Sequence, residues 1–156
     1  MPLFVGEFEQ SIDDKSRLSI SAALRELVNP EEDGSNFILI LGPEGHLWLY
    51  PDKHYKKLIG SMKRSALPTR ERRKIDLWFA MARVLKPDAQ GRVVLPEKTM
   101  LRAELAKANK KVTLIGNDDH IEIWPTDEYE RRVAEELPAL GEALYEAAER
   151  LEQSGE

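Results

Sequence analysis

The feature that most constrains this chain is an internal repeat. Asp13 and Arg17 coincide with Asp88 and Arg92 when the sequence is shifted by 75 residues. Further along, four more pairs of identical residues coincide at a shift of 74 residues: Gly42 with Gly116, His46 with His120, Pro51 with Pro125 and Tyr55 with Tyr129. Matched blocks in the same order indicate a duplicated unit, with a one-residue length change in an intervening loop. The fold is therefore predicted to be a tandem of two similar halves.

Each half shows the same predicted order of strand, polar turn, strand, helix, hairpin and helix. The expected strands around the turns are residues 4–12 and 17–20, then 81–85 and 92–95. The expected hairpins join 37–41 to 47–50 through 42–45, and 112–115 to 121–124 through 116–119. Short helices are expected at 22–28 and 97–106, and Asp52 and Thr126 are suitable N-caps for the helices after the hairpins.

Neither half has enough residues to bury both faces of its strands, so the halves are expected to complete one another's core. Apolar residues at helical spacing predict a connecting helix within residues 67–82. The segment from Thr126 to Gln153 is helix-prone but contains Pro138 and Gly141, which predict a break into two helices.

The composition narrows the class of protein. Cysteine is absent from the 156 residues, which excludes disulfides, thiolate metal sites and cysteine nucleophiles. We expect a cytoplasmic protein, since the N-terminus does not form a signal peptide and no apolar run is long enough to span a bilayer. The formal charge is −5, yet from Asp127 onward ten carboxylates face three arginines. The rest of the chain is therefore mildly basic, which permits nucleic-acid binding without requiring it.

Several of these residues together resemble a known family. The two Asp-x-x-x-Arg turns, the segment Asp88–Pro96 and the strand Ile121–Trp124 resemble the MraZ family, over roughly residues 3–135. That family is related to the AbrB-like swapped-hairpin barrels. The resemblance implies an α+β fold: a duplicated AbrB-like swapped-hairpin β-barrel of two pseudo-symmetric βαββα-type units with peripheral helices. The expected parts are a first repeat (1–66), a connecting helix (67–82), a second repeat (83–135) and an acidic helical tail (136–156).

The resemblance also implies a function. It predicts a sequence-specific, DNA-binding transcriptional regulator that acts as a ring-shaped homo-oligomer on repeated promoter boxes of the division and cell wall gene cluster. The expected location is the cytoplasm, in association with the nucleoid. No enzymatic activity, cofactor, metal, membrane or small-molecule substrate is expected.

The candidate site consists of the two turns. An arginine on a rigid turn suits DNA because its guanidinium is always charged and can grip phosphate or guanine with two parallel hydrogen bonds. We expect Asp13 and Asp88 to orient the turns. The residues expected to approach DNA are Lys15, Arg17, Gln90 and Arg92. The alternative is that each aspartate pairs with its own arginine and only closes the turn.

Two residues depart from the family pattern in the first turn. Ser16 stands where glycine is usual, and Ser21 stands where proline usually opens the helix. Because glycine reaches positive φ without steric cost, Ser16 predicts a shifted or mildly strained first turn. The second turn keeps both usual residues.

Other notable residues receive structural interpretations. His46 and His120 are attributed to turn chemistry and not to a metal site, because no further histidine or cysteine lies at ligand spacing. Trp48, Trp78 and Trp124 are expected in the core or a subunit interface. The basic run from Lys56 to Lys74 is interpreted as the solvated face of amphipathic helices.

Two rival functions remain open. One is an AbrB-type antitoxin, which a disordered toxin-binding tail would favour; the C-terminus is instead predicted to be helical. The other is a ring-forming structural protein with weakened DNA binding, suggested by the acidic balance and by Ser16 and Ser21. An enzyme is the least favoured class, because the sequence has no phosphate-binding glycine loop, nucleophile elbow or zinc-protease helix.

Overall fold

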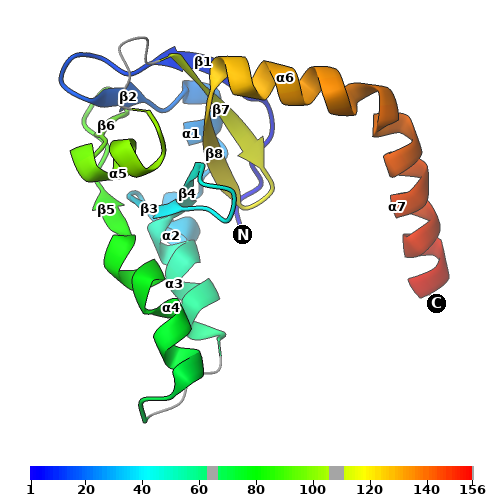
Figure 1. The fold of residues 1–156 in the computed structure, drawn as a ribbon, viewed down its shortest axis with the longest axis horizontal. Coiled ribbons are helices and arrows are strands. Elements are labelled where there is room, and N and C mark those ends of the chain that lie inside the picture. The colour runs from blue at the N-terminus through cyan, green and yellow to red at the C-terminus, as the bar shows by residue number, and fades with distance from the viewer. Residues whose placement is uncertain (63–66, 106–110, 156) are drawn as a thin grey trace. The chain divides into compact units, whose positions relative to one another are not determined.

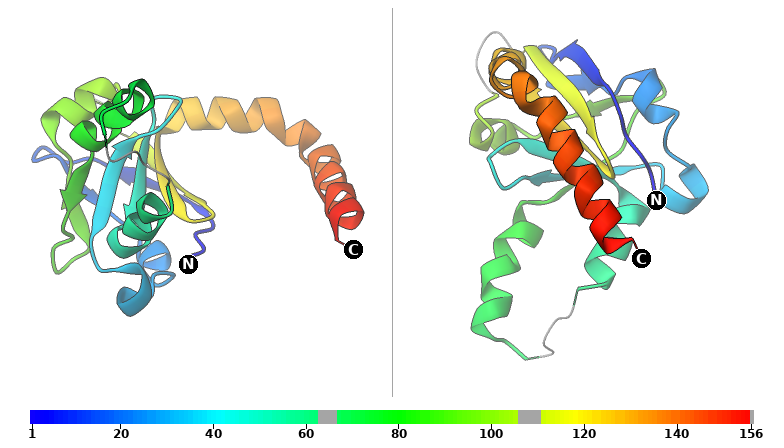
Figure 2. Two further views of the ribbon diagram at one scale, coloured as in Figure 1. Left: turned by 90° about the horizontal axis from the view of Figure 1, so that it is seen from below. Right: turned by 90° about the vertical axis from the view of Figure 1, so that its right-hand side faces the viewer.

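The structure of the chain is a computed structural model that describes residues 1–62, 67–105 and 111–155 and is drawn in Figures 1 and 2. The chain divides into two compact units, Met1–Pro125 and Thr126–Glu156. The first unit contains both turns and both hairpins. The domain boundaries expected from the sequence stay a prediction.

Antiparallel strands build the first unit. The main sheet has six strands in the order β1-β7-β8-β4-β3-β5, and β2 and β6 form a separate two-stranded sheet. The strands are β1 (Glu7–Ser11), β2 (Arg17–Ser19), β3 (Phe37–Leu41), β4 (Leu47–Pro51), β5 (Arg83–Leu85), β6 (Arg92–Val94), β7 (Lys111–Asn117) and β8 (His120–Pro125). The α+β class is confirmed, whereas closure of the sheets into a barrel stays a prediction.

The two halves of the repeat exchange strands. β1 of the first half pairs with β7 of the second, and β5 of the second half pairs with β3 of the first. The two registers are equivalent, because Gln10 opposite Val112 corresponds to Leu85 opposite Phe37. The halves also meet directly through β4 and β8 and through β2 and β6. Each half therefore completes the sheet of the other.

One hydrophobic core serves both halves. Leu18, Leu39 and Leu47 from the first half are fully buried together with Val93, Leu114 and Ile121 from the second, at 0–1% exposure. Burial of each such side chain stabilises the fold by about 1.5–3 kcal/mol. The prediction of a shared core is confirmed, and the sharing occurs within one chain.

The one-residue length change lies in the hairpin loop itself. In the first hairpin Leu41 pairs with Leu47, and in the second Gly116 pairs with Ile121, so the second loop is one residue shorter. Gly116 is thus the counterpart of Leu41 and belongs to a strand, and the predicted loop 116–119 is wrong. Any side chain at Gly116 would collide with the Val5 backbone, 2.5 Å from an added Cβ. The turn is formed by Asp118 and Asp119, with Asp118 at φ +66°.

Two predicted strands are too long. β1 begins at Glu7 and not at Phe4, because Gly6 adopts φ +102° and interrupts the extended backbone. Phe4 instead forms an isolated bridge with Asp118. β5 begins at Arg83, since the preceding helix continues to Met81.

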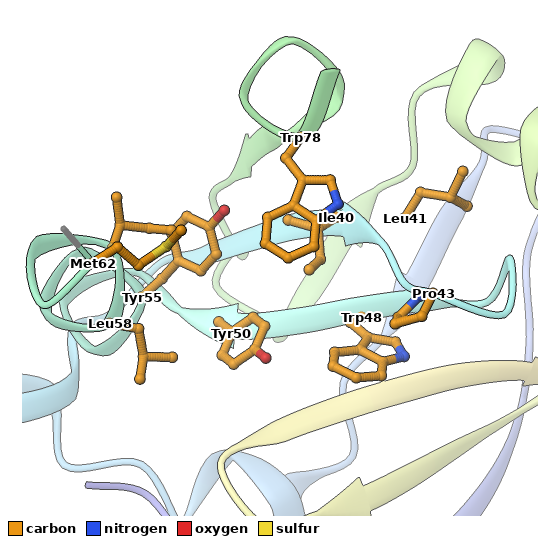
Figure 3. Close-up of a pocket in the computed structure, with 10 residues that line it drawn as sticks. Ile40, Leu41, Pro43, Trp48, Tyr50, Tyr55, Leu58, Met62 and Trp78 are labelled. Atoms are coloured by element: carbon orange, nitrogen blue, oxygen red, sulfur yellow. The ribbon is translucent and has the colours of Figure 1, made fainter. Parts of the chain in front are cut away.

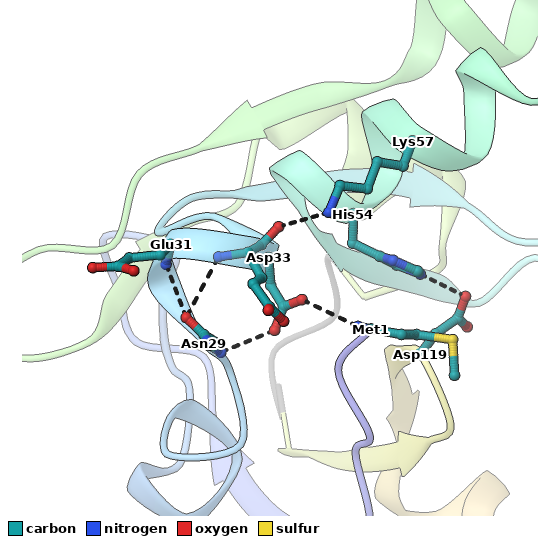
Figure 4. Close-up of polar contacts among 8 residues, drawn as sticks. Met1, Asn29, Glu31, Asp33, His54, Lys57 and Asp119 are labelled. Carbon is teal, nitrogen blue, oxygen red and sulfur yellow. Dashed lines mark hydrogen bonds and ion pairs between the residues drawn. The ribbon is translucent and has the colours of Figure 1, made fainter.

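Short helices connect the strands, as Figure 1 shows. They are α1 (Ala22–Arg25), α2 (Pro30–Asp33), α3 (Asp52–Gly60), α4 (Arg70–Met81) and α5 (Glu97–Arg102). The predicted helix 22–28 is too long; a separate helix α2 follows, whose N-terminus is capped by the Asn29 side chain at 3.1 Å from the Glu31 nitrogen (Figure 4). The helix expected at 97–106 ends at Arg102, and Ala106 lies outside the described residues.

Helix α4 confirms the connecting helix, and the Thr69 side chain caps it by accepting a hydrogen bond from the Arg72 nitrogen at 3.1 Å. The expected caps after the hairpins are one residue off. Pro51 occupies the N-cap of α3, and Asp52 is its first residue.

The second unit is helical. It contains α6 (Thr126–Glu136), a 3-10 turn (Leu137–Ala139) and α7 (Leu140–Ser154). Pro138 breaks the helix as predicted, because its ring excludes the backbone hydrogen bond that a continuous helix needs. Gly141 does not break it, and lies in the first turn of α7.

Candidate nucleic-acid interface

The first turn is closed by a network around Asp13. Its Oδ1 accepts hydrogen bonds from the backbone nitrogens of Lys15 and Arg17, at 2.9 and 2.8 Å. Its Oδ2 accepts from Arg17 Nε at 2.6 Å, and the Asp13 nitrogen donates to the Arg17 carbonyl at 3.1 Å. The aspartate therefore fixes both the backbone of the turn and the direction of the arginine.

The second turn repeats this network bond for bond. Asp88 Oδ1 accepts from the nitrogens of Gln90 and Arg92, both at 2.9 Å. Its Oδ2 accepts from Arg92 Nε at 2.9 Å, and its nitrogen donates to the Arg92 carbonyl at 2.9 Å. The orienting role predicted for the two aspartates thus has a geometric basis in both halves.

Ser16, which stands where the family usually has glycine, adopts the backbone conformation of a glycine. Ser16 adopts φ +61° and its counterpart Gly91 adopts φ +78°. Each donates its backbone N–H to the carbonyl of the turn aspartate, at 3.0 Å to Asp13 and 2.9 Å to Asp88. The first turn is therefore not shifted. It is strained instead, because a side chain at positive φ has steric costs that glycine avoids.

Pairing of β2 with β6 brings the two turns into one surface. Arg17 lies opposite Val94 and Ser19 lies opposite Arg92. Side chains alternate along a strand, and the intervening residues of this ribbon, Leu18 and Val93, point into the core. Arg17 and Arg92 therefore share the outward face as diagonal neighbours, roughly 7–8 Å apart. The turns themselves lie at opposite ends of the ribbon, because the two strands are antiparallel.

Each turn arginine is bound to its aspartate through Nε, and its terminal nitrogens can contact another molecule. Backbone hydrogen bonds from Arg17 and Arg92, only partly offset by burial, lower the pKa of Asp13 and Asp88 below the usual value. Both aspartates are thus charged at neutral pH, and they accept hydrogen bonds from the Nε atoms of Arg17 and Arg92. Among the residues that the structure describes, neither guanidinium makes a hydrogen bond through its terminal nitrogens.

Lys15 and Gln90 occupy equivalent positions at the two ends of the ribbon. Both are exposed, and neither side chain forms a hydrogen bond within the described residues. The four residues predicted to approach DNA therefore lie along one ribbon, in the order Lys15, Arg17, Arg92 and Gln90.

The sequence reasoning missed one cation beside this ribbon. The Arg25 side chain lies over Gly91, where an added Cβ would be 2.5 Å from Arg25 Nε. That Nε donates to the Ile20 carbonyl at 2.9 Å, which holds the side chain against the second turn. The repeat could not reveal Arg25, because the residue 75 positions on is Met100, which is buried.

It also missed two ribbon residues. Ser19 and Val94 are counterparts in the repeat and point outward between the arginines, and Val94 is 59% exposed. The sequence could have indicated both residues, because side chains alternate along a strand and Ser19 and Val94 lie two residues from Arg17 and Arg92.

The two equivalent histidines have a different role from the one predicted. His46 stacks on Trp124 with ring centroids 3.6 Å apart, and His120 stacks on Trp48 at 3.9 Å. Both histidines are buried on the face of β4 and β8 opposite the core. They are packing residues of the sheet, and turn chemistry does not explain them.

A buried polar cluster accompanies His120. Glu122 accepts hydrogen bonds from Trp124 Nε1 at 2.9 Å and Asn117 Nδ2 at 2.7 Å, and contacts His120 Nε2 at 2.9 Å. Burial opposes ionisation of Glu122, but these hydrogen bonds outweigh it and lower its pKa to about 2. Burial also opposes the charged form of His120, but hydrogen bonds to Glu122 and Asp119 raise its pKa above 6.5.

Helix α3 is tied to the second hairpin through Asp119. Its carboxylate contacts His54 Nε2 at 2.9 Å (Figure 4). It also contacts His120 Nδ1 at 3.1 Å. Burial raises the pKa of Asp119, but the hydrogen bonds from His54 and His120 outweigh it and leave the pKa below its usual value. Across residues 1–62, 67–105 and 111–155, no three histidine, aspartate or glutamate side chains are arranged to hold a metal ion.

The remaining aromatic and basic residues divide by location. Trp124 is buried and Trp48 half-buried, whereas Trp78 on α4 is 52% exposed. The basic run lies largely at the exposed surface of α3 and α4, as predicted, and Lys63 and Arg64 fall outside the described residues. None of the described helices combines the length and apolar character needed to cross a bilayer.

The fold and site define a class: duplicated α+β proteins whose halves exchange strands and present paired Asp–Arg turns. The family model described as "MraZ protein, putative antitoxin-like" matches residues 3–77 and again residues 78–150. The chain belongs to the MraZ family. This family is not one of enzymes, in agreement with the prediction from the sequence.

Three relatives illustrate the likeness, and each is named a transcriptional regulator MraZ. The protein of Clostridium acetobutylicum is 34% identical over 81% of this chain and 84% of its own length. That of Pediococcus pentosaceus is 33% identical over 85% of this chain and 88% of its own. That of Moorella thermoacetica is 34% identical over 91% and 96%, respectively.

Proposed function

We propose that this chain is a transcriptional regulator that binds duplex DNA through the outward face of the β2–β6 ribbon. The observation that carries the proposal is the pairing that places Arg17 and Arg92 on one exposed face. The major groove of B-DNA admits a two-stranded ribbon, and arginine there can bind guanine through two hydrogen bonds. The names of the MraZ relatives support the regulatory role.

The side chains divide the work. Asp13 and Asp88 hold each arginine by Nε, which leaves the terminal nitrogens to contact guanine or phosphate. Lys15 supplies a phosphate contact at one end of the ribbon, and Gln90 supplies an amide that can read adenine at the other.

Arg25 adds a cation beside the second turn. Between the arginines, Ser19 and Val94 are placed to meet base edges, since a hydroxyl can hydrogen-bond to a base and an apolar group can contact a thymine methyl.

The assembly follows from the size of the ribbon. Three residue pairs contact few base pairs, so one copy alone binds weakly. A ring-shaped homo-oligomer that engages repeated promoter boxes multiplies the contacts through effective concentration. We place this assembly on the promoter of the division and cell wall gene cluster, in the cytoplasm and at the nucleoid.

The test is a titration of fluorescent duplex DNA from that promoter, with a shuffled duplex as control, at two salt concentrations. Wild-type protein is expected to prefer the promoter. The double variant Arg17→Ala/Arg92→Ala is expected to bind at least about thirtyfold more weakly, since each lost arginine contact costs about 1–3 kcal/mol.

A matched variant removes two exposed arginines from the second unit, Arg131→Ala/Arg150→Ala, and is expected to bind like wild type. Equal binding of both duplexes by wild type and by the turn variant, at unchanged oligomer size, would sink the assignment of the ribbon.

A second candidate is an antitoxin, which the antitoxin-like description of the family favours. Such a protein would also bind DNA, so the titration does not separate the two. Co-expression with a candidate toxin does: an antitoxin restores growth, whereas a regulator of division genes leaves the toxicity unchanged. A ring-forming structural protein would assemble and show neither result.

A further inference from the structure

The β2–β6 ribbon has an approximate two-fold axis through its centre. Arg17 lies opposite Val94 at one end, and Arg92 lies opposite Ser19 at the other. A two-fold rotation about this axis exchanges Arg17 with Arg92 and Ser19 with Val94. The rotation therefore superposes residues that coincide in the sequence repeat. We call the end with Arg17 and Val94 the first end, and the end with Arg92 and Ser19 the second end.

Backbone hydrogen bonds extend the same symmetry beyond the strands. Ile20 donates to the Gly91 carbonyl at 3.0 Å, and Leu95 donates to the Ser16 carbonyl at 2.8 Å. The two bonds are counterparts, because Ile20 coincides with Leu95 and Ser16 coincides with Gly91 in the repeat. The backbone alone therefore gives the ribbon the same shape from either direction.

The symmetry matters for the contact with duplex DNA. The two strands of DNA are antiparallel, so its backbone also has approximate two-fold symmetry, and proteins with two-fold symmetry match palindromic sites. A ribbon with identical ends would make the same contacts with a promoter box in either direction. Only side chains that differ between the two ends can select one direction.

The side chains that meet base edges differ in this way. At the first end Arg17 is accompanied by Val94, which is 59% exposed. At the second end Arg92 is accompanied by Ser19. An apolar side chain can contact a thymine methyl, whereas a hydroxyl hydrogen-bonds to base edges. The two ends therefore favour different bases beside the guanine that each arginine can bind.

The charged groups around the two turns differ as well. Lys15 lies on the turn at the first end, and the neutral Gln90 lies on the turn at the second. The Arg25 guanidinium covers the second turn, where a Cβ added to Gly91 would be 2.6 Å from Arg25 Cζ. The counterpart of Arg25 in the repeat is Met100, which is buried. A cation is thus fixed in this position at the second end alone.

We propose that the ribbon binds a non-palindromic box in one direction, which is selected by the unequal pairs Lys15/Gln90 and Ser19/Val94. The first end meets a guanine beside a thymine, and Lys15 contacts a phosphate next to it. At the second end Gln90 and Ser19 hydrogen-bond to base edges, and Arg25 contacts a phosphate. The inference rests on the proposed function, because it requires the outward face of the ribbon to meet base edges.

The test exchanges the unequal pairs between the two ends. The variant Lys15→Gln/Gln90→Lys/Ser19→Val/Val94→Ser gives each end the side chains of the other and keeps both turn arginines. It is expected to bind the same box in the reverse direction. A second variant, Lys15→Gln/Gln90→Lys, changes only the exposed turns and is expected to reduce the preference for one direction.

Site-directed cleavage of DNA reads the direction. The chain has no cysteine, so one introduced cysteine can carry an iron chelate that cleaves nearby DNA. Ala23 and Lys98 are exposed counterparts in the repeat. Ala23 lies on α1, whose Arg25 covers the second turn, and Lys98 lies on α5, which follows the strand that reaches the first turn. Ala23→Cys and Lys98→Cys therefore label the two ends of the ribbon.

The DNA is a short duplex that carries one promoter box with different flanks. In the otherwise wild-type chain, the chelate at Ala23→Cys is expected to cleave one flank about tenfold more than the other, and the chelate at Lys98→Cys the opposite flank. In the full exchange variant the two labels are expected to trade flanks. Arg25→Ala is expected to weaken binding and to keep the direction.

A matched control exchanges counterparts away from the ribbon. Ile59 lines the apolar cavity drawn in Figure 3, whose lining comes from α3, α4, β3, β4 and adjoining loops. Ile59→Val/Val133→Ile is expected to give the wild-type cleavage pattern. Thermal unfolding verifies that each variant folds.

The outcomes separate this proposal from the proposed function. Equal cleavage of both flanks by each label, with box binding intact, would overturn the single direction and leave the proposed function standing. Unchanged flanks in the full exchange variant would overturn the assignment of the two pairs. Loss of box-dependent cleavage in the otherwise wild-type chain would overturn both proposals.

Discussion

The two turns of this chain have stayed alike, while the two hairpins have diverged. Both turns have the same hydrogen bonds around Asp13 and Asp88, although one uses serine and the other glycine at positive φ. In the hairpins, the first half has Trp48 where the second half has Glu122, and the second loop is one residue shorter. The turns present side chains outward, whereas the hairpins meet each other inside the molecule.

This contrast shows which parts of the two halves can diverge in sequence after a duplication. An outward turn is specified by its own backbone hydrogen bonds, so either half can form it independently. The hairpins face one another across β4 and β8, so a tryptophan from one half can pack on a histidine from the other. A change on one side is accommodated by the other, and identity is not required.

The largest expected effect concerns the diverged hairpin. Glu122→Ala removes the acceptor used by His120, Trp124 and Asn117 and is expected to lower the free energy of unfolding by about 3–5 kcal/mol. Urea denaturation measures the loss. Glu9→Ala, an exposed glutamate on β1, is the matched control and is expected to change stability by less than about 0.5 kcal/mol. Equal losses in both variants would show that the polar cluster does not stabilise the fold.

The next effect separates the two turns by their charge. The first turn offers two cations, Lys15 and Arg17, and the second pairs Arg92 with the neutral Gln90. Lys15→Ala/Arg17→Ala is expected to flatten the dependence of log affinity on log salt by about 2, and Gln90→Ala/Arg92→Ala by about 1. Titrations at four salt concentrations measure both slopes. Identical slope changes would mean that Lys15 does not contact phosphate.

A smaller effect is expected from exchanging the residues at positive φ. Ser16→Gly relieves steric strain and is expected to stabilise the chain by about 0.5–1 kcal/mol. Gly91→Ser introduces the same strain and is expected to destabilise it by about 1 kcal/mol or more, because the new Cβ meets the Arg25 side chain. Thermal unfolding of both variants measures the difference. A stabilising Gly91→Ser would contradict the contact with Arg25.

The smallest expected effect is the pH dependence that arises from the second hairpin. The pKa of His120 is raised above 6.5, so its contribution to stability is complete below pH 6.5 and is lost as the pH rises through the folded value. Glu122 acts at the other end, since its contribution is present above pH 4.5 and is lost as the pH falls toward about 2. As the pH rises above 6.5, the melting temperature of wild type is expected to fall more than that of His120→Gln. Parallel curves would exclude His120 as the titrating group.

Much of the fold could be predicted because the repeat revealed it. The turns, the order of elements and the shared core all follow from residues that coincide between the halves. The second hairpin loop was predicted to begin at Gly116 because Gly42 and Gly116 coincide when the sequence is shifted by 74 residues. In the structure Gly116 is the counterpart of Leu41 and lies in a strand, because the second loop is one residue shorter. Register depends on the pairing of two strands, which the sequence of one strand does not reveal. Arg25 could not be predicted either, since it contacts a turn of the other half.

The exchange of strands also has a consequence for synthesis of the chain. β1 leaves the ribosome first but pairs with β7, which is made near the end of the first unit. Until then β1 has no partner and β3 has one bare edge, because β5 is also supplied by the second half. Contacts so distant in sequence form slowly, and an exposed strand edge can pair with another chain. A nascent first half is thus open to capture by an identical half, through the same pairings that later complete the finished molecule.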